Sequence, residues 1–327
     1  GGMHPTITRA EPHDLDSPEA WPVHGIEALS RTQELATWGV TDLAWTARYV
    51  ASRLREQSYA HRAWWVATLP GSPPTAQSVV GCAAATLGLS GNEHLAEIDL
   101  LVHPEHRRAG IGSALLAAAE QFARDHGRTT AIVASEHHGE PAADHPDALG
   151  APTGHGRILA SDPGAAFALS HGWALEQAER YSVLELPVDA GLLGTLHSAA
   201  AARAGEEYRL VQWTDRAPEE HVDAVGELYT RMSTEVPLAD LAMAEERWDA
   251  ARVRTAESGI AEAGNGYLFV AAQHLPSRRI AAFTEVEYPR EDETVVFQQD
   301  TLVLPEFRGR RLGMLVKTAM LGSLVTT

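Results

Sequence analysis

The sequence contains little cysteine, a deficit of basic residues and no long apolar run. Cys82 is the single cysteine among 327 residues, which precludes an internal disulfide and favours a reducing compartment. Lys and Arg number 26 against 44 Asp and Glu, so the net charge of −18 disfavours binding to nucleic acid or to anionic membrane surfaces. No run of about eighteen apolar residues and no apolar signal core occurs, and we therefore expect a cytoplasmic protein without membrane or nucleic-acid partners.

The composition that remains is that of a globular protein long enough for two domains, since a domain takes roughly 100–200 residues. We expect an α+β fold with a first lobe at residues 1–189, a helical linker at 190–207 and a second lobe at 208–327. Residues 136–163 are rich in Gly, Pro, His and Asp and long for a connection, so they form an insertion that is either a substrate loop or disordered.

Hydrophobic periodicity predicts the same order of elements in both lobes, namely a strand, two helices, three strands and a helix. We expect each lobe to be a mixed, mostly antiparallel sheet flanked by helices. In the first lobe a strand, a short helix and a strand pair, Trp173–Glu179 and Tyr181–Leu186, follow. The sequence ends at Thr327, where the next strand of the second lobe would begin, so we expect that lobe to be incomplete at its C-terminus.

The two lobes also resemble each other residue by residue. Residues 97–116 align with residues 298–317 at an offset of 201, and the same residue types recur on the same predicted strand, turn and helix, which indicates duplication. The seven identical pairs are Asp99/Asp300, Leu101/Leu302, Val102/Val303, Pro104/Pro305, Glu105/Glu306, Arg107/Arg308 and Gly112/Gly313.

The turn at residues 107–112, RRAGIG, lies between a predicted strand and a predicted helix. The first amides of a helix lack internal partners, and together with the helix dipole they attract anions such as a pyrophosphate. Gly110 and Gly112 would let such a ligand approach the backbone, although a plain tight turn gives the same pattern. The Gly-Lys-Ser/Thr run of a P-loop is missing, and the preceding meander of strands does not suit a Rossmann unit.

Arg107, Gly110 and Gly112 match the Arg/Gln-x-x-Gly-x-Gly/Ala signature of the GNAT acetyl-CoA-dependent N-acetyltransferases, which both lobes resemble in element order. The chain is thus similar to tandem GNAT proteins such as the mycothiol synthases. The resemblance implies acetyl-CoA as co-substrate, with its pantetheine arm along Leu101 and Val102. Residues implied to bind the rest of the coenzyme are Arg107, Arg108, Ala109, Gly110, Ile111, Gly112 and Ser113, with Ser161 replacing the Asn that commonly opens the next helix.

Transfer to an amine requires a general base, and Glu97 and Asp99 are the candidates because they alternate on one strand and share a face. A solvated strand face is the alternative, and the family resemblance favours Glu97. Ala168 stands where the family often has a tyrosine general acid. Tyr181, one of the histidines His137 and His138, or a water molecule would have to take that role.

Other constellations point less directly to a site. The histidines and acids of residues 137–155 match no metal-ligand spacing, so we expect no metal. Trp21, Trp38, Trp45, Trp64 and Trp65 are spaced as core residues, although a pocket lining is the alternative. Residues 232–241 contain Pro237 and fall where GNAT proteins shape their acceptor pocket.

The sequence therefore predicts an acetyl-CoA-dependent N-acetyltransferase that acts on a primary amine of a small, cationic molecule or on a peptide N-terminus, with a homodimer as a candidate assembly. Direct transfer is expected because Cys82 lies in an apolar run. Two alternatives stay open: a coenzyme-binding sensor that transfers nothing, or catalysis in the second lobe. In that lobe Arg311 replaces Gly110 and Gln298 replaces Glu97.

Overall fold

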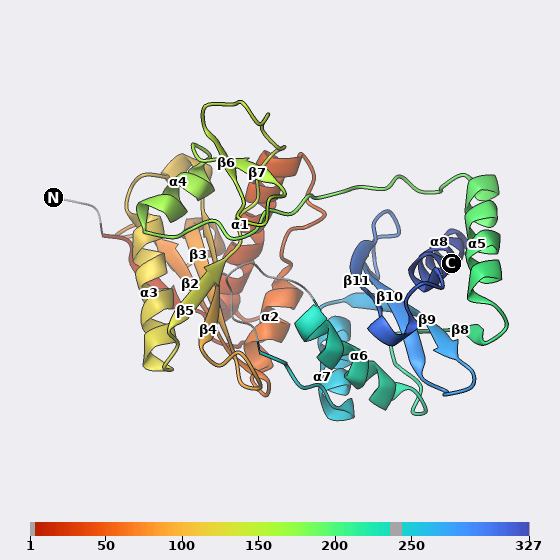
Figure 1. Cartoon of the computed structure of the whole chain (residues 1–327). Helices are drawn as coiled ribbons and strands as arrows, with labels where there is room; N and C mark the ends of the chain where they lie inside the picture. Colours follow the sequence, from red (N-terminus) through yellow and green to blue (C-terminus); the bar gives the residue numbers. More distant parts are fainter. Residues whose placement is uncertain (1–3, 236–243, 327) are drawn as a thin grey trace. The chain divides into compact units, whose positions relative to one another are not determined.

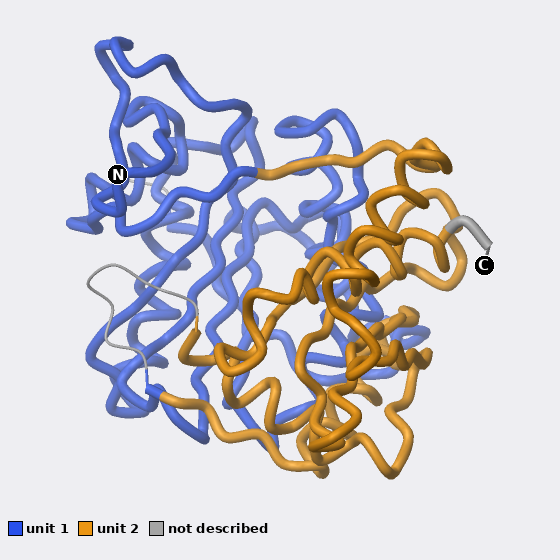
Figure 2. Tube along the Cα trace, turned by 45° about the vertical axis from the view of Figure 1, so that its right-hand side comes forward, with its two compact units in different colours: residues 1–180, 237–244 blue, residues 181–236, 245–327 orange. Residues whose placement is uncertain are grey.

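The computed structural model describes residues 4–235 and 244–326. The chain divides into two compact units, residues 1–180 with 237–244 and residues 181–236 with 245–327 (Figure 2). Each unit has its own sheet and its own hydrophobic core.

The first unit is built on a sheet with the strand order β1-β2-β3-β4-β5 (Figure 1). The first four strands, β1 (Thr6–Arg9), β2 (Ala60–Thr68), β3 (Val79–Gly88) and β4 (Leu95–Val102), pair antiparallel in sequence order. The fifth strand, β5 (Thr130–Val133), lies parallel to β4. β2 and β3 are buried along most of their length, as expected of strands covered on both faces.

Helices cover both faces of this sheet. On one face α1 (Trp21–Trp38) and α2 (Ala47–Arg55) pack on a core that includes Val66 and Ala84. On the other face α3 (Ile111–Asp125) and α4 (Pro163–Ser170) pack on a second core. Burial of these apolar faces is what joins the predicted elements into one unit.

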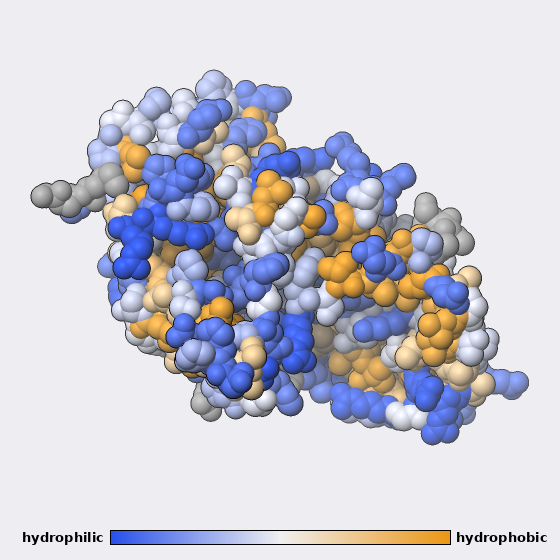
Figure 3. All heavy atoms as spheres, turned by 90° about the horizontal axis from the view of Figure 1, so that it is seen from above, coloured by the Kyte–Doolittle hydropathy of each residue, from blue (hydrophilic) through white to orange (hydrophobic). Residues whose placement is uncertain are grey.

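The expected insertion at residues 136–163 contains a small hairpin of β6 (Ala148–Gly150) and β7 (Arg157–Leu159). The strand pair predicted after α4 is wrong, because residues 173–189 contain no strand. A strand needs a neighbour to accept its backbone hydrogen bonds, and alternating apolar residues do not supply one. Val183 and Leu184 of this segment are 72% and 61% exposed. Figure 3 shows hydrophobic residues exposed among hydrophilic ones on the face it presents.

The second unit repeats the antiparallel part of the first. Its sheet has the order β11-β10-β9-β8, and all pairs in the described residues are antiparallel. The strands are β8 (Tyr208–Thr214), β9 (Asn265–His274), β10 (Ile280–Pro289) and β11 (Phe297–Val303). The predicted order of elements is confirmed here, and with it the α+β class.

The helices of the second unit also cover both faces. α6 (Val222–Glu235) and α7 (Ala250–Glu262) pack on one face, and α8 (Leu312–Thr326) packs on the other. α5 (Ala190–Ala204), at the position expected for a linker, packs against α8 and buries two alanines in the same core. In the described parts of both units, none of the helices is both long and apolar enough to span a bilayer.

Candidate functional site

β4 and β5 pair over only part of their length. The parallel register joins Leu95–Ile98 to Thr130–Val133 and ends there, whereas on its other side β4 stays paired with β3 as far as Val102. In the described chain, the edge of Asp99–Val102 that would continue this ladder has no strand beside it. An open backbone edge can bind an extended, amide-bearing ligand.

The loop that follows β4 leads into α3 through two residues with left-handed backbone angles. After the turn η3 (Pro104–His106), Arg108 and Gly110 adopt left-handed φ angles of 62° and 82°, and α3 then begins at Ile111. No described group accepts a hydrogen bond from the first three amides of α3. A Cβ at Gly110 would have no neighbour within 4 Å, so the space beside this backbone is open. The loop can thus receive a phosphate group on its amides.

Several loop residues that were predicted to bind the coenzyme make contacts within the first unit itself. The Nη2 of Arg107 donates to Oε1 of Gln33 on α1 over 3.0 Å. A Cβ at Gly112 would lie 2.9 Å from the Phe167 ring of α4, so helix packing also requires this glycine. Ile111 is 1% exposed and can offer a ligand only its amide, while the hydroxyl of Ser113 lies 3.1 Å from His171 Nε2.

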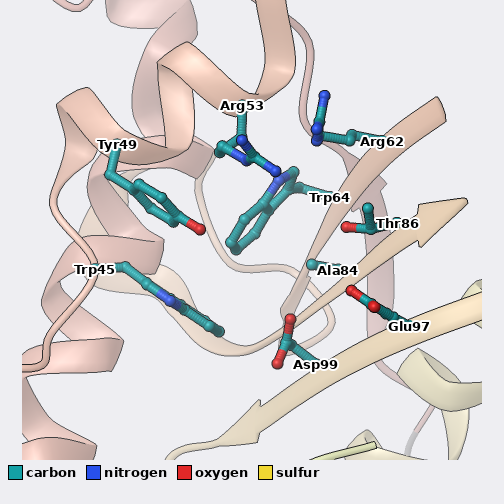
Figure 4. A pocket seen from close by; sticks show the side chains of 9 residues that line it. All are labelled: Trp45, Tyr49, Arg53, Arg62, Trp64, Ala84, Thr86, Glu97 and Asp99. Atoms are coloured by element: carbon teal, nitrogen blue, oxygen red, sulfur yellow. The ribbon is translucent and has the colours of Figure 1, made fainter. Parts of the chain in front are cut away.

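A pocket opens on the α1/α2 face of the sheet (Figure 4). The strand registers arrange its floor in two rows: Trp64, Ala84 and Asp99 form one, and Arg62, Thr86 and Glu97 form the next. Three residues of the wall come from α2 and the segment before it: Trp45, Tyr49 and Arg53. The structure thus brings both predicted bases into one pocket, beside the point where β4 and β5 part.

The pocket holds charges of both signs at opposite ends. Figure 4 shows Arg53 and Arg62 at one end and Glu97 and Asp99 at the other. Arg62 lies 3.6 Å from Glu56, whereas no described residue forms an ion pair or hydrogen bond with the Arg53 side chain. Burial raises the pKa of Asp99 above its ordinary value, which makes its carboxylate a stronger base than an exposed one.

Two predicted site residues do not join the pocket. Tyr181 lies beyond the first unit in the segment without strands, 49% exposed, and is not among the residues that line the pocket. Ser161 does not cap α4, because Asp162 holds the N-cap position. Pro163 follows directly, and the residue before a proline is pushed into the extended conformation that an N-cap needs.

The insertion is attached to α1 next to the loop. Trp38 Nε1 donates to Glu136 Oε2 over 3.0 Å, and His138 Nδ1 lies 3.0 Å from the carbonyl oxygen of Thr37. Burial, together with the neighbouring Glu136, raises the pKa of Glu34 to about 8. These two contacts join the beginning of the insertion to the end of α1.

Sequence reasoning missed several of these residues. Arg53, Arg62 and Tyr49 come from different elements, and no spacing rule connects them before the sheet register is known. Trp45 and Trp64 were expected in the core; they line the pocket as well, with ring centroids 5.1 Å apart.

Within the described chain, no group of three His, Cys, Asp or Glu residues could hold a metal ion. The predicted contribution of residues 232–241 lies mostly outside the described residues.

The second unit repeats the loop, but it carries different side chains at the positions that form the pocket of the first unit. Gly309 and Arg311 have φ angles of 88° and 54°, so Arg311 keeps the left-handed conformation of Gly110. In the strand next to Asp300, Glu285 stands where the first unit has Ala84, and Tyr229 donates to Glu285 Oε2 over 2.8 Å. A carboxyl and a phenol thus occupy the space that the small alanine leaves open in the first unit.

This buried carboxyl makes the stability of the chain depend on pH. Burial raises the pKa of Glu285 from 4.5 to about 8, so the folded state binds a proton that the unfolded state releases above about 4.5. This stabilisation is complete below that pH and is lost as the pH rises to about 8, and the loss is on the order of a few kcal/mol.

We expect Glu285→Gln to flatten the decline of the free energy of unfolding with pH, measured by denaturant unfolding between pH 5 and 8. Glu291→Gln, at an exposed position, should retain it, and equal slopes in both variants would contradict the prediction.

Comparison with known proteins agrees with this geometry. Residues 33–145 match the acetyltransferase (GNAT) family model. A tandem GNAT protein from the clavulanic acid biosynthesis pathway superposes with a TM-score of 0.65 at 24% identity, covering 99% of this chain and 86% of that one. A GCN5-related N-acetyltransferase from Sphaerobacter thermophilus gives 0.53 at 13% identity, covering 98% and 83%. The curated proteins give no match. Part of the chain therefore matches the acetyltransferase (GNAT) family model, and the whole chain has the fold of a tandem GNAT protein.

Proposed function

We propose that the first unit binds acetyl-CoA and transfers its acetyl group directly to a primary amine. The observation that carries this proposal is the position of Asp99, which lies in the pocket and is also the first β4 residue beyond the pairing with β5. A coenzyme whose pyrophosphate binds the amides before α3 would extend along the open edge of Asp99–Val102. Its thioester would then face the pocket.

In this arrangement Asp99 removes the proton from the attacking ammonium group. The amine nitrogen forms a bond to the thioester carbonyl carbon, the carbon–sulfur bond breaks, and coenzyme A leaves as a thiolate that takes up the second proton lost by the nitrogen. Cys82 is 1% exposed and burial raises the pKa of its thiol, so it cannot serve as an intermediate acceptor. Glu97, one row away on the same face, is placed to orient the amine.

The pocket favours an acceptor that carries a carboxylate as well as an amine. Arg62 and Glu97 occupy the same row two strands apart, and neighbouring strands are about 4.8 Å apart, so their backbones are about 10 Å apart. A small amino-acid-like molecule can reach both ends with its carboxylate near Arg53 and its amine near Asp99. The net charge of the chain suggested a cationic acceptor, and the pocket adds a carboxylate to that expectation. The charges that line the pocket contact the substrate, whereas the net charge of the whole chain does not.

Arg53→Gln should raise KM for a carboxylate-bearing acceptor by about 10- to 100-fold, since a hydrogen bond to a charged group contributes about 1.5–3 kcal/mol. The KM of the matching amine without the carboxylate should stay within about twofold. Arg55→Gln is the control, because Arg55 is exposed on the same helix and does not line the pocket. An equal effect of Arg53→Gln on both acceptors would argue against this role.

The proposed function is tested by incubating the full chain with acetyl-CoA and a panel of amines, with and without carboxylates, while free thiol is measured. Amine-dependent thiol release is the expected result. Calorimetric binding of acetyl-CoA without release for any amine would favour the coenzyme sensor. Release that is lost in Asp300→Asn and kept in Asp99→Asn would move catalysis to the second unit.

A further inference from the structure

Three polar side chains at the end of β5 form a chain of hydrogen bonds that the proposed acetyl transfer does not use. Ser135 Oγ lies 2.7 Å from His137 Nε2, and His137 Nδ1 lies 2.9 Å from Asp162 Oδ2. Ser135 and His137 follow β5 directly, and Asp162 returns from the insertion twenty-five residues later. Nucleophile, base and carboxylate thus stand within hydrogen-bonding distance in the order that activates a serine hydroxyl.

The chemistry of the three groups determines the proton positions. A carboxylate only accepts hydrogen bonds, so His137 must donate its Nδ1–H to Asp162. In the neutral imidazole, Nε2 is then the acceptor and the Ser135 hydroxyl donates to it. This is the tautomer that a general base needs in order to take the serine proton.

The first turn of α4 supplies a site for the negative charge of a tetrahedral intermediate. A Cβ placed on Gly164 would lie 3.2 Å from the Ser135 Cβ and 3.8 Å from its Oγ, so the serine lies beside this turn. No described group accepts from the amides of Gly164 and Ala165. Asp162 is the N-cap residue, yet its side chain makes no capping hydrogen bond, and its Oδ2 bonds His137 instead. The free amides can therefore stabilise an oxyanion.

The histidine is held in place while the serine stays accessible. Glu136 and His138, on either side of His137, are both hydrogen-bonded to α1, and the His137 side chain is 10% exposed. Ser135 is exposed. A fixed base beside an open nucleophile is the preorganisation that covalent catalysis requires.

We propose that Ser135, His137 and Asp162 form a second catalytic site, a nucleophilic serine site that hydrolyses small acyl esters or thioesters. The Ser135 oxygen bonds to the acyl carbon while its proton passes to His137 Nε2. The ester or thioester bond then breaks, and His137 returns the proton to the leaving alcohol or thiol. Water, deprotonated by His137, attacks the acyl-serine and releases the carboxylic acid and the free Ser135 hydroxyl.

The test uses the full chain and a fluorophosphonate, which bonds covalently to activated serines. Peptide mapping by mass spectrometry should locate the label on Ser135. His137→Asn and Asp162→Asn should slow labelling by about 100-fold or more, because a triad acts as a unit. Ser135→Ala should lose both the label and the hydrolysis of p-nitrophenyl acetate. Acetyl-CoA hydrolysis, measured as free thiol without amine, distinguishes a thioester substrate from an oxygen ester.

The chain contains its own control. Ser113 also contacts a histidine, but Nδ1 of that residue, His171, lies 2.9 Å from the carbonyl of Phe167, and no carboxylate joins the pair. Ser113 should stay unlabelled, and Ser170→Ala should leave labelling of Ser135 unchanged. Equal labelling of Ser113 and Ser135, or no effect of Asp162→Asn in a variant with an unchanged melting temperature, would overturn the proposal. Ser135→Ala should keep amine acetylation, which separates this test from that of the proposed function.

Discussion

Asp99→Asn is expected to lower kcat for amine acetylation by about 10²- to 10⁴-fold, the usual contribution of a general base. Asparagine keeps the shape of the side chain but cannot accept the proton of the attacking ammonium group. Because burial raises the pKa of Asp99, the wild-type kcat should rise with pH as this carboxyl ionises, and the variant should lose that step. Steady-state kinetics across a pH series measure both effects.

The duplication supplies the matched control. Asp300 occupies the corresponding position in the second unit, and burial raises its pKa in the same direction. Asp300→Asn should leave kcat within about twofold of the wild type. Glu97→Gln should act mainly on KM if Glu97 only orients the amine. A loss of kcat in Glu97→Gln that exceeds the loss in Asp99→Asn would instead assign the base to Glu97, as the family resemblance favours.

Gly110→Trp is expected to weaken acetyl-CoA binding by at least about tenfold. The φ angle of Gly110 is 82°, which strains a bulky residue by about 1–3 kcal/mol, and the indole would cover the amides before α3. Each charge-assisted hydrogen bond lost from a phosphate weakens binding by about 1.5–3 kcal/mol. Calorimetric titration of the full chain with acetyl-CoA gives both the affinity and the number of sites.

Strain and site blocking can be told apart with a second glycine. Gly127 lies just beyond the other end of α3 and has a φ angle of 73°, and a Cβ at this residue would likewise have no neighbour within 4 Å. Gly127→Trp should lower the melting temperature to a similar degree and leave acetyl-CoA affinity unchanged. Gly313→Trp tests the second unit, and loss of binding in that variant alone would place the coenzyme there.

Local patterns were enough for the parts of the fold in which each element can be recognised by itself. The alignment of the two lobes at an offset of 201 predicted that the loop before α3 would recur before α8. The structure agrees, because Gly110 and the corresponding Arg311 both have left-handed φ angles. The prediction of a strand pair after α4 was wrong. A strand forms only beside a neighbouring strand, and the sequence of Tyr181–Leu186 does not specify such a neighbour.

The sequence by itself determined the α+β class, the duplication, the glycine-containing loop before α3 and the pair Glu97 and Asp99, because each depends on residues close together in the chain. Only the tertiary structure decided that Arg53 and Arg62 face these carboxylates in one pocket, and that Ser135, His137 and Asp162 meet. Contacts of this kind depend on strand register and on where an insertion returns to the sheet. Packing of the whole unit sets both, and no short pattern along the chain encodes them.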